Sequence, residues 1–300
     1  MSEKNTSASK GIILYIFFTT LIIGMTAGGK ALQEQGMHPI EVAFIRNFLA
    51  FVLVAMLIAA KQQTHLYKTN MIKGQISRGI IGNVSLIVAF WAAALLPLAQ
   101  VTAIGFTMPL FTMIMSALFL KETIGIWRIS ALITGFTSVI LIAQPAVETD
   151  NILGLSVALI SAFLIACTSI NLRFLGRSNE PALTTVFYFL GFGIIFDGLL
   201  LPFVWTGTMI SETTLWLIGF TAFVGFLSQI VKTEAYANAE ASLLSPILYL
   251  NIVWATLADW IVWDELPAPT VITGCTLLIT SNLFILWREY KNEKTYIQPK

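Results

Sequence analysis

Charge is the scarcest feature of this sequence. Of its 300 residues, 11% are charged and 57% are hydrophobic, and the mean hydropathy is +0.82. A soluble domain carries about 25% charged residues, so this chain has too little polar surface to cover a core of that size in water. The net charge of +1, with no basic patch, also argues against a nucleic-acid partner. The composition therefore indicates a lipid bilayer as the surroundings of the protein.

Cysteine is scarce too. Cys167 and Cys275 both fall inside apolar runs, so we expect unpaired packing residues rather than a disulfide or a metal site. The sequence contains no phosphate-cradling G-x-x-x-x-G-K-[ST] loop, which excludes ATP hydrolysis by that route. We expect no cofactor, no metal and no catalytic residue.

Long apolar runs, in contrast, are abundant. A transmembrane helix needs roughly 20 mostly apolar residues, and short connectors separate the runs. The first run follows Lys4 and Lys10 like a signal peptide, but the nine others and an internal repeat argue against its cleavage. We predict an all-α polytopic membrane protein with ten transmembrane helices. The expected spans are 12–31, 40–60, 76–95, 99–120, 127–144, 152–172, 183–204, 214–236, 242–263 and 269–287.

The basic residues of the connectors set the expected orientation. Cytoplasmic loops carry an excess of Lys and Arg. With the N-terminus inside, Lys30 is the one basic residue assigned to the outer segments. We therefore expect a multi-pass protein of the inner or plasma membrane with both termini in the cytoplasm. The inner segments then hold Lys4, Lys10, Lys61, Lys68, Lys73, Arg78, Lys121, Arg128, Arg173, Arg177, Arg288, Lys291, Lys294 and Lys300.

An internal repeat is visible at a spacing of 143 residues. Gly82 matches Gly225 and Glu122 matches Glu265, with several weaker matches at the same offset. Because five spans separate equivalent positions, the two halves are expected to be inverted five-helix repeats. Inverted repeats are typical of transporters, in which the substrate site lies near the midplane between the halves. The predicted repeats are 11–145 and 152–288.

Two stretches of the sequence resemble EamA domains of the drug/metabolite transporter superfamily. The first runs from Leu96-Pro97-Leu98-Ala99 to Leu120-Lys121-Glu122, and the second from Ala241-Ser242-Leu243-Leu244-Ser245-Pro246 to Asp264-Glu265. The resemblance covers essentially the whole chain as two repeats. It implies ten helices, cytoplasmic termini, a central cavity lined by helices one to four and six to nine, and a metabolite as cargo. The pattern departs at Pro109, whose counterpart in the second half is Ile252.

Ionisable residues inside a bilayer are functional candidates by default. Arg46 either anchors a substrate carboxylate or phosphate, or pairs with Glu41 or Asp197. Lys232 shares a helix face with Gln229. It either faces the cavity and sets its charge preference, or snorkels to the cytoplasmic surface.

Three glutamates invite mainly structural interpretations. We expect Glu234 at the membrane interface. Glu122 and Glu265 each close one span and open a tight turn. We expect each to accept hydrogen bonds from the N-terminus of the next helix, where the helix dipole favours an acid. Proton coupling is the alternative for both.

Uncharged candidates for the cavity come from three predicted spans. Aromatic rings, amides and hydroxyls suit a flat or amphipathic metabolite, although aromatics that only pack helices are the plain alternative. Phe106 and Tyr249 are repeat equivalents, so we expect them on opposite sides of one cavity. The uncharged candidates are Tyr249, Asn251 and Trp254 in the ninth span, Thr102, Phe106 and Thr107 in the fourth, and Asn83 and Trp91 in the third.

These features favour a secondary carrier that moves a small organic metabolite by alternating access, with a coupling proton or an exchanged solute as a further partner. An integral membrane enzyme is one alternative. Such an enzyme would need clustered His, Asp or Glu for metal or acid–base chemistry. The two histidines, His38 and His65, fall in connectors on opposite sides of the membrane, which argues against it. A membrane scaffold or receptor is the other alternative, and it would lack an extramembrane surface on which to recruit a partner.

Overall fold

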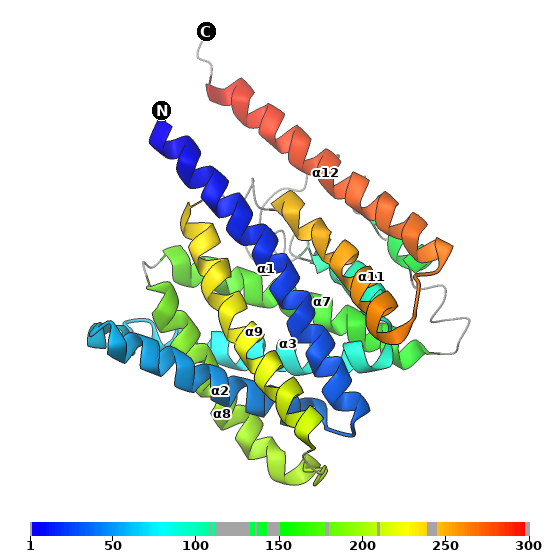
Figure 1. The fold of residues 1–300 in the computed structure, drawn as a ribbon. Helices are drawn as coiled ribbons and strands as arrows, with labels where there is room; N and C mark the ends of the chain where they lie inside the picture. Colours follow the sequence, from blue (N-terminus) through cyan, green and yellow to red (C-terminus); the bar gives the residue numbers. More distant parts are fainter. Residues whose placement is uncertain are drawn as a thin grey trace.

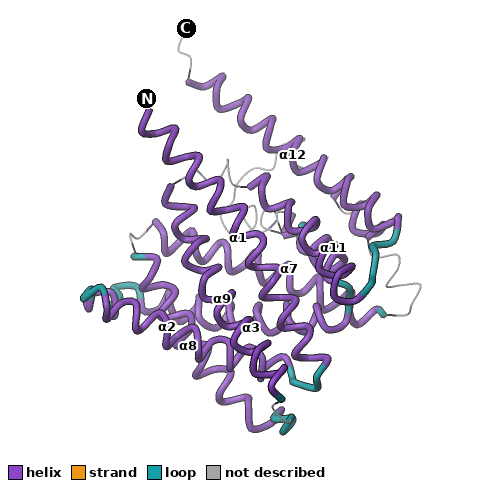
Figure 2. Tube along the Cα trace, viewed as in Figure 1, coloured by secondary structure: helices purple, strands orange, loops and turns teal. Residues whose placement is uncertain are grey.

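The computed structural model describes residues 2–108, 110–111, 114, 133–135, 137–142, 151–177, 180–208, 211–238 and 245–297. Within these ranges the regular secondary structure is helical, and no strand occurs (Figure 2). Pro109 and Glu122 lie outside the described residues, so the predictions for them stay open.

Long helices joined by short connectors make up the described chain (Figure 1). Two short 3-10 segments, Thr64–Tyr67 and Ser245–Tyr249, interrupt them. The α-helices described from end to end are α1 (Ser2–Glu34), α2 (Pro39–Ala60), α3 (Ile72–Leu95), α4 (Leu98–Gly105), α7 (Ile152–Arg177), α8 (Ala182–Val204), α9 (Glu212–Asn238), α11 (Leu250–Trp263) and α12 (Pro269–Ile297).

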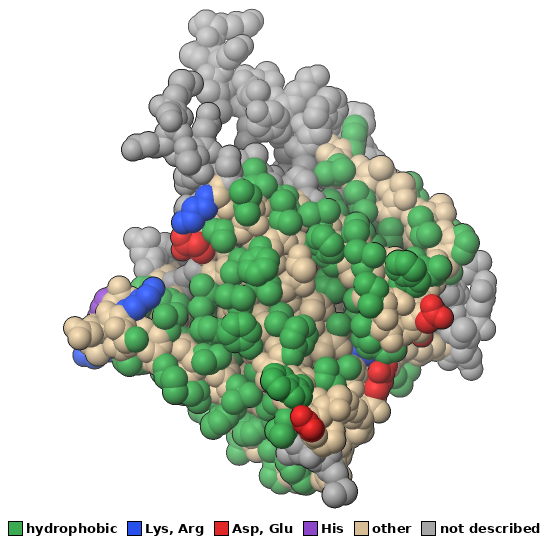
Figure 3. Space-filling model, in the orientation of Figure 1, with side chains coloured by type: hydrophobic (Ala, Val, Ile, Leu, Met, Phe, Trp, Pro, Cys, Tyr) green, Lys and Arg blue, Asp and Glu red, His purple; other side chains and the backbone are tan. Residues whose placement is uncertain are grey.

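Five of the described helices are long and apolar enough to cross a membrane, and they correspond to spans one, two, three, seven and eight of the prediction. Shorter apolar helices fall in four more predicted spans, and α4 begins the span expected at 99–120. Hydrophobic side chains cover the visible face of the molecule (Figure 3). Phe203 and Trp216 are 85% and 74% exposed. Such exposure of large apolar side chains is unfavourable in water but not against lipid chains. The prediction of an all-α polytopic membrane protein is confirmed.

Local sequence explains where α2 begins. Pro39 occupies the first helical position, where its missing N–H is harmless. The Nδ1 atom of His38 accepts the N–H of Ile40, and Glu41 accepts the N–H of His38. Glu41 also accepts hydrogen bonds from the backbone N–H and the hydroxyl of Thr206, both at 2.8 Å. Glu41 therefore joins α2 to the segment after α8 and is not the partner of Arg46.

The helix packing follows the expected symmetry. At the offset of 143 residues, α1 is equivalent to α7, α3 to α9, α2 to α8 and α4 to α11. In the structure α1 packs against α9 and α3 against α7, while α2 packs against α8 and α4 against α11. Each of these four contacts is thus matched by its equivalent or by itself, as two repeats related by a twofold axis require. The repeat boundaries 11–145 and 152–288 stay a prediction.

The two chain ends share one side of the bundle. The start of α1 and the end of α12 lie at the same end of the molecule, and α12 stands at its edge (Figure 1). This placement agrees with an even number of membrane crossings and with a peripheral tenth helix.

Candidate functional site

A buried polar network joins the middle of α2, α3 and α8. The Nη1 atom of Arg46 donates to Oδ1 of Asn47 at 2.8 Å. Asn47 donates through Nδ2 to Asn83 and to Asp197, both at 2.8 Å. Asn83 in turn donates to the carbonyl oxygens of Gly79 and Phe189. Arg46 therefore reaches Asp197 through Asn47, not through the direct pair considered from the sequence.

Two more cations lie near this network. Arg78 on α3 is 8% exposed, and its guanidinium carbon lies 4.5 Å from the ring centroid of Phe189. The ammonium of Lys232 on α9 lies 5.4 Å from the ring centroid of Phe18. The carbonyl oxygen of Phe189 also accepts a hydrogen bond from Asn83, so Arg78 packs directly on the network. Lys232 lies about two turns along α9 from Gly225, which packs against Arg46. We call Arg46, Asn47, Arg78, Asn83, Asp197 and Lys232 the interior polar cluster.

Several buried polar atoms in this region have no hydrogen-bond partner within the part of the chain that the structure describes. They include Nε of Arg46, Nε of Arg78, Oδ1 of Asp197 and the hydroxyl of Thr221. Buried polar groups are normally hydrogen-bonded, so these four atoms are candidates for contact with a polar ligand or water. Arg46 and Thr221 line the same narrow recess between α2 and α9.

Glycine lets the helices approach the interior polar cluster. A Cβ atom at Gly193 would lie 2.4 Å from Oδ1 of Asn83 and 2.6 Å from Nδ2 of Asn47. A Cβ atom at Gly225 would lie 2.9 Å from Nε of Arg46. Small residues at helix contacts are common in membranes because they allow close backbone approach. Here they make room for polar side chains.

The cluster is built around the repeat symmetry but is not itself symmetric. Arg46 corresponds to Phe189 and Arg78 to Thr221 at the offset of 143 residues. Arg46 lies beside Thr221, and Phe189 lies beside Arg78. The α2–α9 contact and its repeat equivalent, the α8–α3 contact, therefore each contain one arginine. The arginine lies on α2 in the first contact and on α3 in the second, so the cluster surrounds the pseudo-twofold axis that relates the two contacts.

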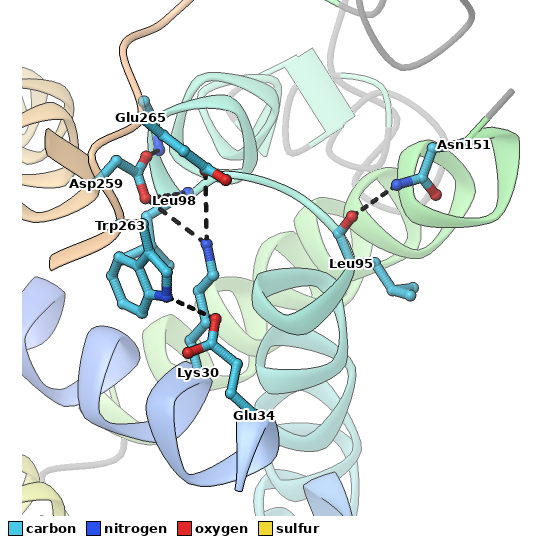
Figure 4. Close-up of polar contacts among 9 residues, drawn as sticks. Lys30, Glu34, Leu95, Leu98, Asn151, Asp259, Trp263 and Glu265 are labelled. Carbon is cyan, nitrogen blue, oxygen red and sulfur yellow. Dashed lines mark hydrogen bonds and ion pairs between the residues drawn. The ribbon is translucent and has the colours of Figure 1, made fainter. Parts of the chain in front are cut away.

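A second group of charges lies near the bundle end that is remote from the start of α1 (Figure 4). Lys30, 6% exposed, lies 3.9 Å from carboxylate oxygens of Asp259 and Glu265 and 4.1 Å from the ring centroid of Trp263. The indole N–H of Trp263 donates to Glu34 at 2.5 Å. We call these five residues the Lys30 cluster. It links α1, α11 and the turn that follows α11.

The Lys30 cluster corrects one prediction. Asp259 accepts the backbone N–H groups of Leu98 and Ala99 at 2.9 and 2.6 Å (Figure 4), so it satisfies the N-terminus of α4. Glu265 was expected to do this for the helix that follows it. Among the described residues its carboxylate instead faces Lys30, and no hydrogen bond joins it to the start of α12. The acid that caps α4 is therefore Asp259 of α11, a helix that is distant in sequence but adjacent in space.

The aromatic candidates mainly pack helices together and do not line a cavity. The rings of Phe106 and Tyr249 meet edge to face, with centroids 5.0 Å apart, so they touch each other and do not face across a cavity. The indole N–H of Trp254 donates to the hydroxyl of Thr19 at 3.1 Å, joining α11 to α1. Trp91 is 42% exposed on the outward stripe that also carries Ile80, which argues against a role in the interior.

The hydroxyl and amide candidates divide into two groups. Asn83 belongs to the interior polar cluster. Thr107 is buried with an unpaired hydroxyl and borders an apolar cavity of about 210 Å³ beside Leu110 and Leu159. Among the described residues the buried side-chain oxygen of Asn251 has no hydrogen-bond partner, so Asn251 stays a cavity candidate. Thr102 is partly buried on α4.

The two charged residues near the end of α9 have different surroundings. Glu234 is half-exposed and forms an ion pair with Lys10 at 3.0 Å, in line with the interfacial position expected for it. Lys232 lies only partly exposed against Phe18 of α1. This orientation agrees with the inward alternative for Lys232.

Sequence reasoning missed Asn47, Arg78 and Asp259 as site residues. Arg78 had been grouped with the cytoplasmic cations because it lies near the start of its span. A signal did exist for Asp259, since a carboxylate well inside an apolar span is rare. Asn47 directly follows Arg46, which places two strongly polar residues side by side in an otherwise apolar span.

Comparisons with known proteins agree with this architecture. Residues 9–144 match the EamA-like transporter family. The S-adenosylmethionine uptake transporter of Rickettsia bellii is 26% identical, over 85% of this chain and 86% of its own. The riboflavin transporter of Vibrio cholerae is 28% identical, over 87% of each chain. The pseudopaline exporter of Pseudomonas aeruginosa is 26% identical, over 80% of this chain and 84% of its own.

A solved structure shares the fold. It superposes with a TM-score of 0.60 over 93% of this chain and 96% of that chain, at 13% sequence identity. The helical bundle, the apolar exterior and the related sequences lead to one conclusion: this chain, whose residues 9–144 match the EamA-like transporter family, is a membrane transporter of small metabolites.

Proposed function

We propose that this transporter is a secondary carrier of the inner or plasma membrane, with both termini in the cytoplasm, that moves an organic metabolite by alternating access. The interior polar cluster carries this proposal. Its side chains come from α2 and α3 in the first half and from α8 and α9 in the second. A site shared by two inverted halves changes its accessible side when the halves rock about it.

The related proteins support the class of cargo. Their names give S-adenosylmethionine, riboflavin and pseudopaline, all small organic metabolites. They include both uptake and export, so only the class of cargo is carried over to this chain.

The amides of the cluster suit a binding site. Asn47 and Asn83 hydrogen-bond to each other, and Asn47 also donates to Asp197. Cargo can replace these contacts with its own without leaving the groups unpaired, so the exchange is nearly balanced in free energy. Asp197 is the acid positioned to take a coupling proton, and exchange against a second solute is the alternative source of driving force.

In this proposal the Lys30 cluster closes the outer side. It joins α1, α4 and α11 through the ion pairs of Lys30 and through the bonds that Asp259 accepts from α4 (Figure 4). Opening the outer side requires α4 to separate from α11, which would break these contacts.

Uptake into proteoliposomes tests the carrier. A panel of labelled metabolites that includes S-adenosylmethionine and riboflavin should contain at least one that accumulates or exchanges in a protein-dependent way. Asn47→Ala and Asn83→Ala should slow its transport about tenfold or more, the scale of one lost hydrogen bond to a polar ligand. Thr276→Ala is the matched control, because Thr276 is exposed on α12 and its hydrogen bonds to described residues stay within its own helix.

Two results would contradict the proposal. In the first, no metabolite moves while the protein is inserted and monodisperse. In the second, a metabolite moves at the same rate in both asparagine variants as in the wild type. The second result would keep the transporter but remove the interior polar cluster as its site.

A further inference from the structure

The interior polar cluster is unbalanced in charge. It holds the cations Arg46, Arg78 and Lys232 but one carboxylate, Asp197. Asn47 connects Asp197 to Arg46. Within the part of the chain that the structure describes, Arg78 and Lys232 have neither a hydrogen-bond partner nor an ion-pair partner.

Unpaired cations are costly in this setting. Burial of a charge is unfavourable unless an opposite charge or hydrogen bonds compensate it. Aromatic faces compensate part of the cost for Arg78 and Lys232, since Phe189 and Phe18 lie against them. An anion compensates far more, because attraction strengthens in a low-dielectric interior.

Both cations lie at a similar depth. Arg78 is six residues after the start of α3, and Lys232 is six residues before the end of α9. At 1.5 Å per residue each lies about 9 Å from its helix end. With both termini cytoplasmic, these two helix ends face the cytoplasm together. The two cations therefore lie at the same depth, in the inner half of the bundle.

Arg78 is also held in place. Its Nη1 atom lies where a Cβ atom on Gly82 would be, and Phe189 covers the other side of the guanidinium. A guanidinium fixed in this way presents its planar fork in one direction, a geometry that suits carboxylate and phosphate oxygens. Lys232 adds a more mobile point charge.

Neither charge belongs to the shared scaffold. The repeat equivalent of Arg78 is Thr221, and that of Lys232 is Ala89. Both equivalents sit in the same bundle without a charge, so helix packing does not require one. A function particular to this chain explains the two cations better than architecture does.

We infer that Arg78 and Lys232 bind the anionic group of the cargo, a carboxylate or a phosphate, in the cytoplasmic half of the transport path. The inference rests on the proposed carrier function and names its substrate class. Cargo enters the interior polar cluster with its anionic group toward Arg78 and Lys232 and its remaining polar groups toward Asn47 and Asn83.

Matched pairs of probes test this assignment on the purified full-length protein. Three pairs are used: S-adenosylmethionine and its methyl ester, riboflavin 5′-phosphate and riboflavin, and succinate and succinamide. The midpoint of thermal unfolding is followed through the eight tryptophans. At least one member that carries the carboxylate or phosphate should raise the midpoint, and its partner without that anionic group should bind about tenfold more weakly or worse. The responding pair tells a carboxylate from a phosphate.

Variants then locate the effect. Arg78→Gln and Lys232→Gln should each remove the preference for the anionic member, and Arg78→Lys and Lys232→Arg should retain part of it. Lys61→Gln should retain all of it, because Lys61 is an exposed loop cation. If a glutamine variant does not fold, reduced preference in the corresponding Lys or Arg variant supports the assignment, and an unchanged preference contradicts it.

Three outcomes of the binding experiments overturn the inference. They are equal binding of both members of every responding pair, an unchanged preference in the folded glutamine variants, and no stabilisation by any probe. Transport of an uncharged metabolite that depends on Asn47 and Asn83 would overturn it while leaving the proposed carrier in place. The two failures are therefore distinguishable.

Discussion

Phe106 and Tyr249 pack edge to face with ring centroids 5.0 Å apart and an interplanar angle of 75°. The two residues are equivalent in the internal repeat, so their contact lies where the pseudo-twofold axis passes between α4 and α11. In this conformation the rings close that part of the bundle. The polar interior lies instead among α2, α3, α8 and α9, which makes these four helices the place to test function.

Gly193→Ala should disrupt the interior polar cluster. The added methyl would lie 2.4 Å from Oδ1 of Asn83 and 2.6 Å from Nδ2 of Asn47, so α8 or the amides must move. We expect a loss of stability of about 1–3 kcal/mol, typical of overpacking, and at least tenfold slower transport. Thermal unfolding and proteoliposome uptake measure the two effects. Gly219→Ala is the control, because its methyl would meet nothing within 4 Å.

Asp259→Asn should weaken the Lys30 cluster. The carboxylate accepts two backbone N–H groups of α4 and faces buried Lys30, and an amide has only one oxygen to offer. We expect a loss of about 1–3 kcal/mol in stability, the scale for a buried charged group that loses its partner. Glu265→Gln should lose less than about 1 kcal/mol, because that acid is half-exposed. Equal losses in chemical unfolding would argue against the distinction.

Trp254→Phe separates packing from cargo binding. The variant keeps an aromatic ring but removes the N–H that donates to Thr19. If this bond only joins α11 to α1, stability falls by about 1 kcal/mol and transport affinity is unchanged. Thr19→Val should have a similar effect, and the double variant should lose no more than either single one. A fall in cargo affinity in Trp254→Phe alone would instead place the indole in the site.

Asn251→Ala tests the remaining cavity candidate on α11. The side-chain oxygen of Asn251 is buried and accepts no hydrogen bond from the residues that the structure describes. Its removal should therefore leave stability within about 1 kcal/mol, while cargo affinity falls several-fold. Saturation curves for uptake, at matched membrane levels, give the affinity. Wild-type affinity would leave Asn251 without a binding role.

Single cysteines test the orientation. In a background that lacks Cys167 and Cys275, a membrane-impermeant maleimide should label Ser211→Cys in intact cells. Gln62→Cys should react only after the membrane is permeabilised. Both positions are exposed in the structure, so access is set by the membrane side alone. Labelling of both from one side would contradict the ten-span topology.

The sequence predicted most of the scaffold because composition and span length depend on local residues. The span expected at 40–60 matches α2 (Pro39–Ala60), and the span expected at 99–120 begins with α4 at Leu98. Position within a span was also informative, since Arg46 and Asp197 were expected inside the bilayer and are buried there.

The partners of the polar residues were harder to predict. Arg78 lies near the start of a helix, where a long side chain can reach water or turn inward, and only the contact with Phe189 decides between them. Asn47 bonds to Asp197, 150 residues away, and Asp259 bonds to the start of α4, 161 residues before it. Such pairings depend on how helices dock, which periodicity along one helix does not determine.

The unequal chemistry of the two halves has a thermodynamic consequence. If the repeats were identical, the inward-open and outward-open conformations would be one structure viewed from opposite sides, with equal free energies. Arg78 corresponds to Thr221, and Asp197 corresponds to Val54. Each such replacement lifts the degeneracy and favours one conformation of the empty carrier. The charges that bind the cargo therefore also determine which side of the membrane the empty carrier faces. A cargo gradient of the same size then drives transport at different rates in the two directions.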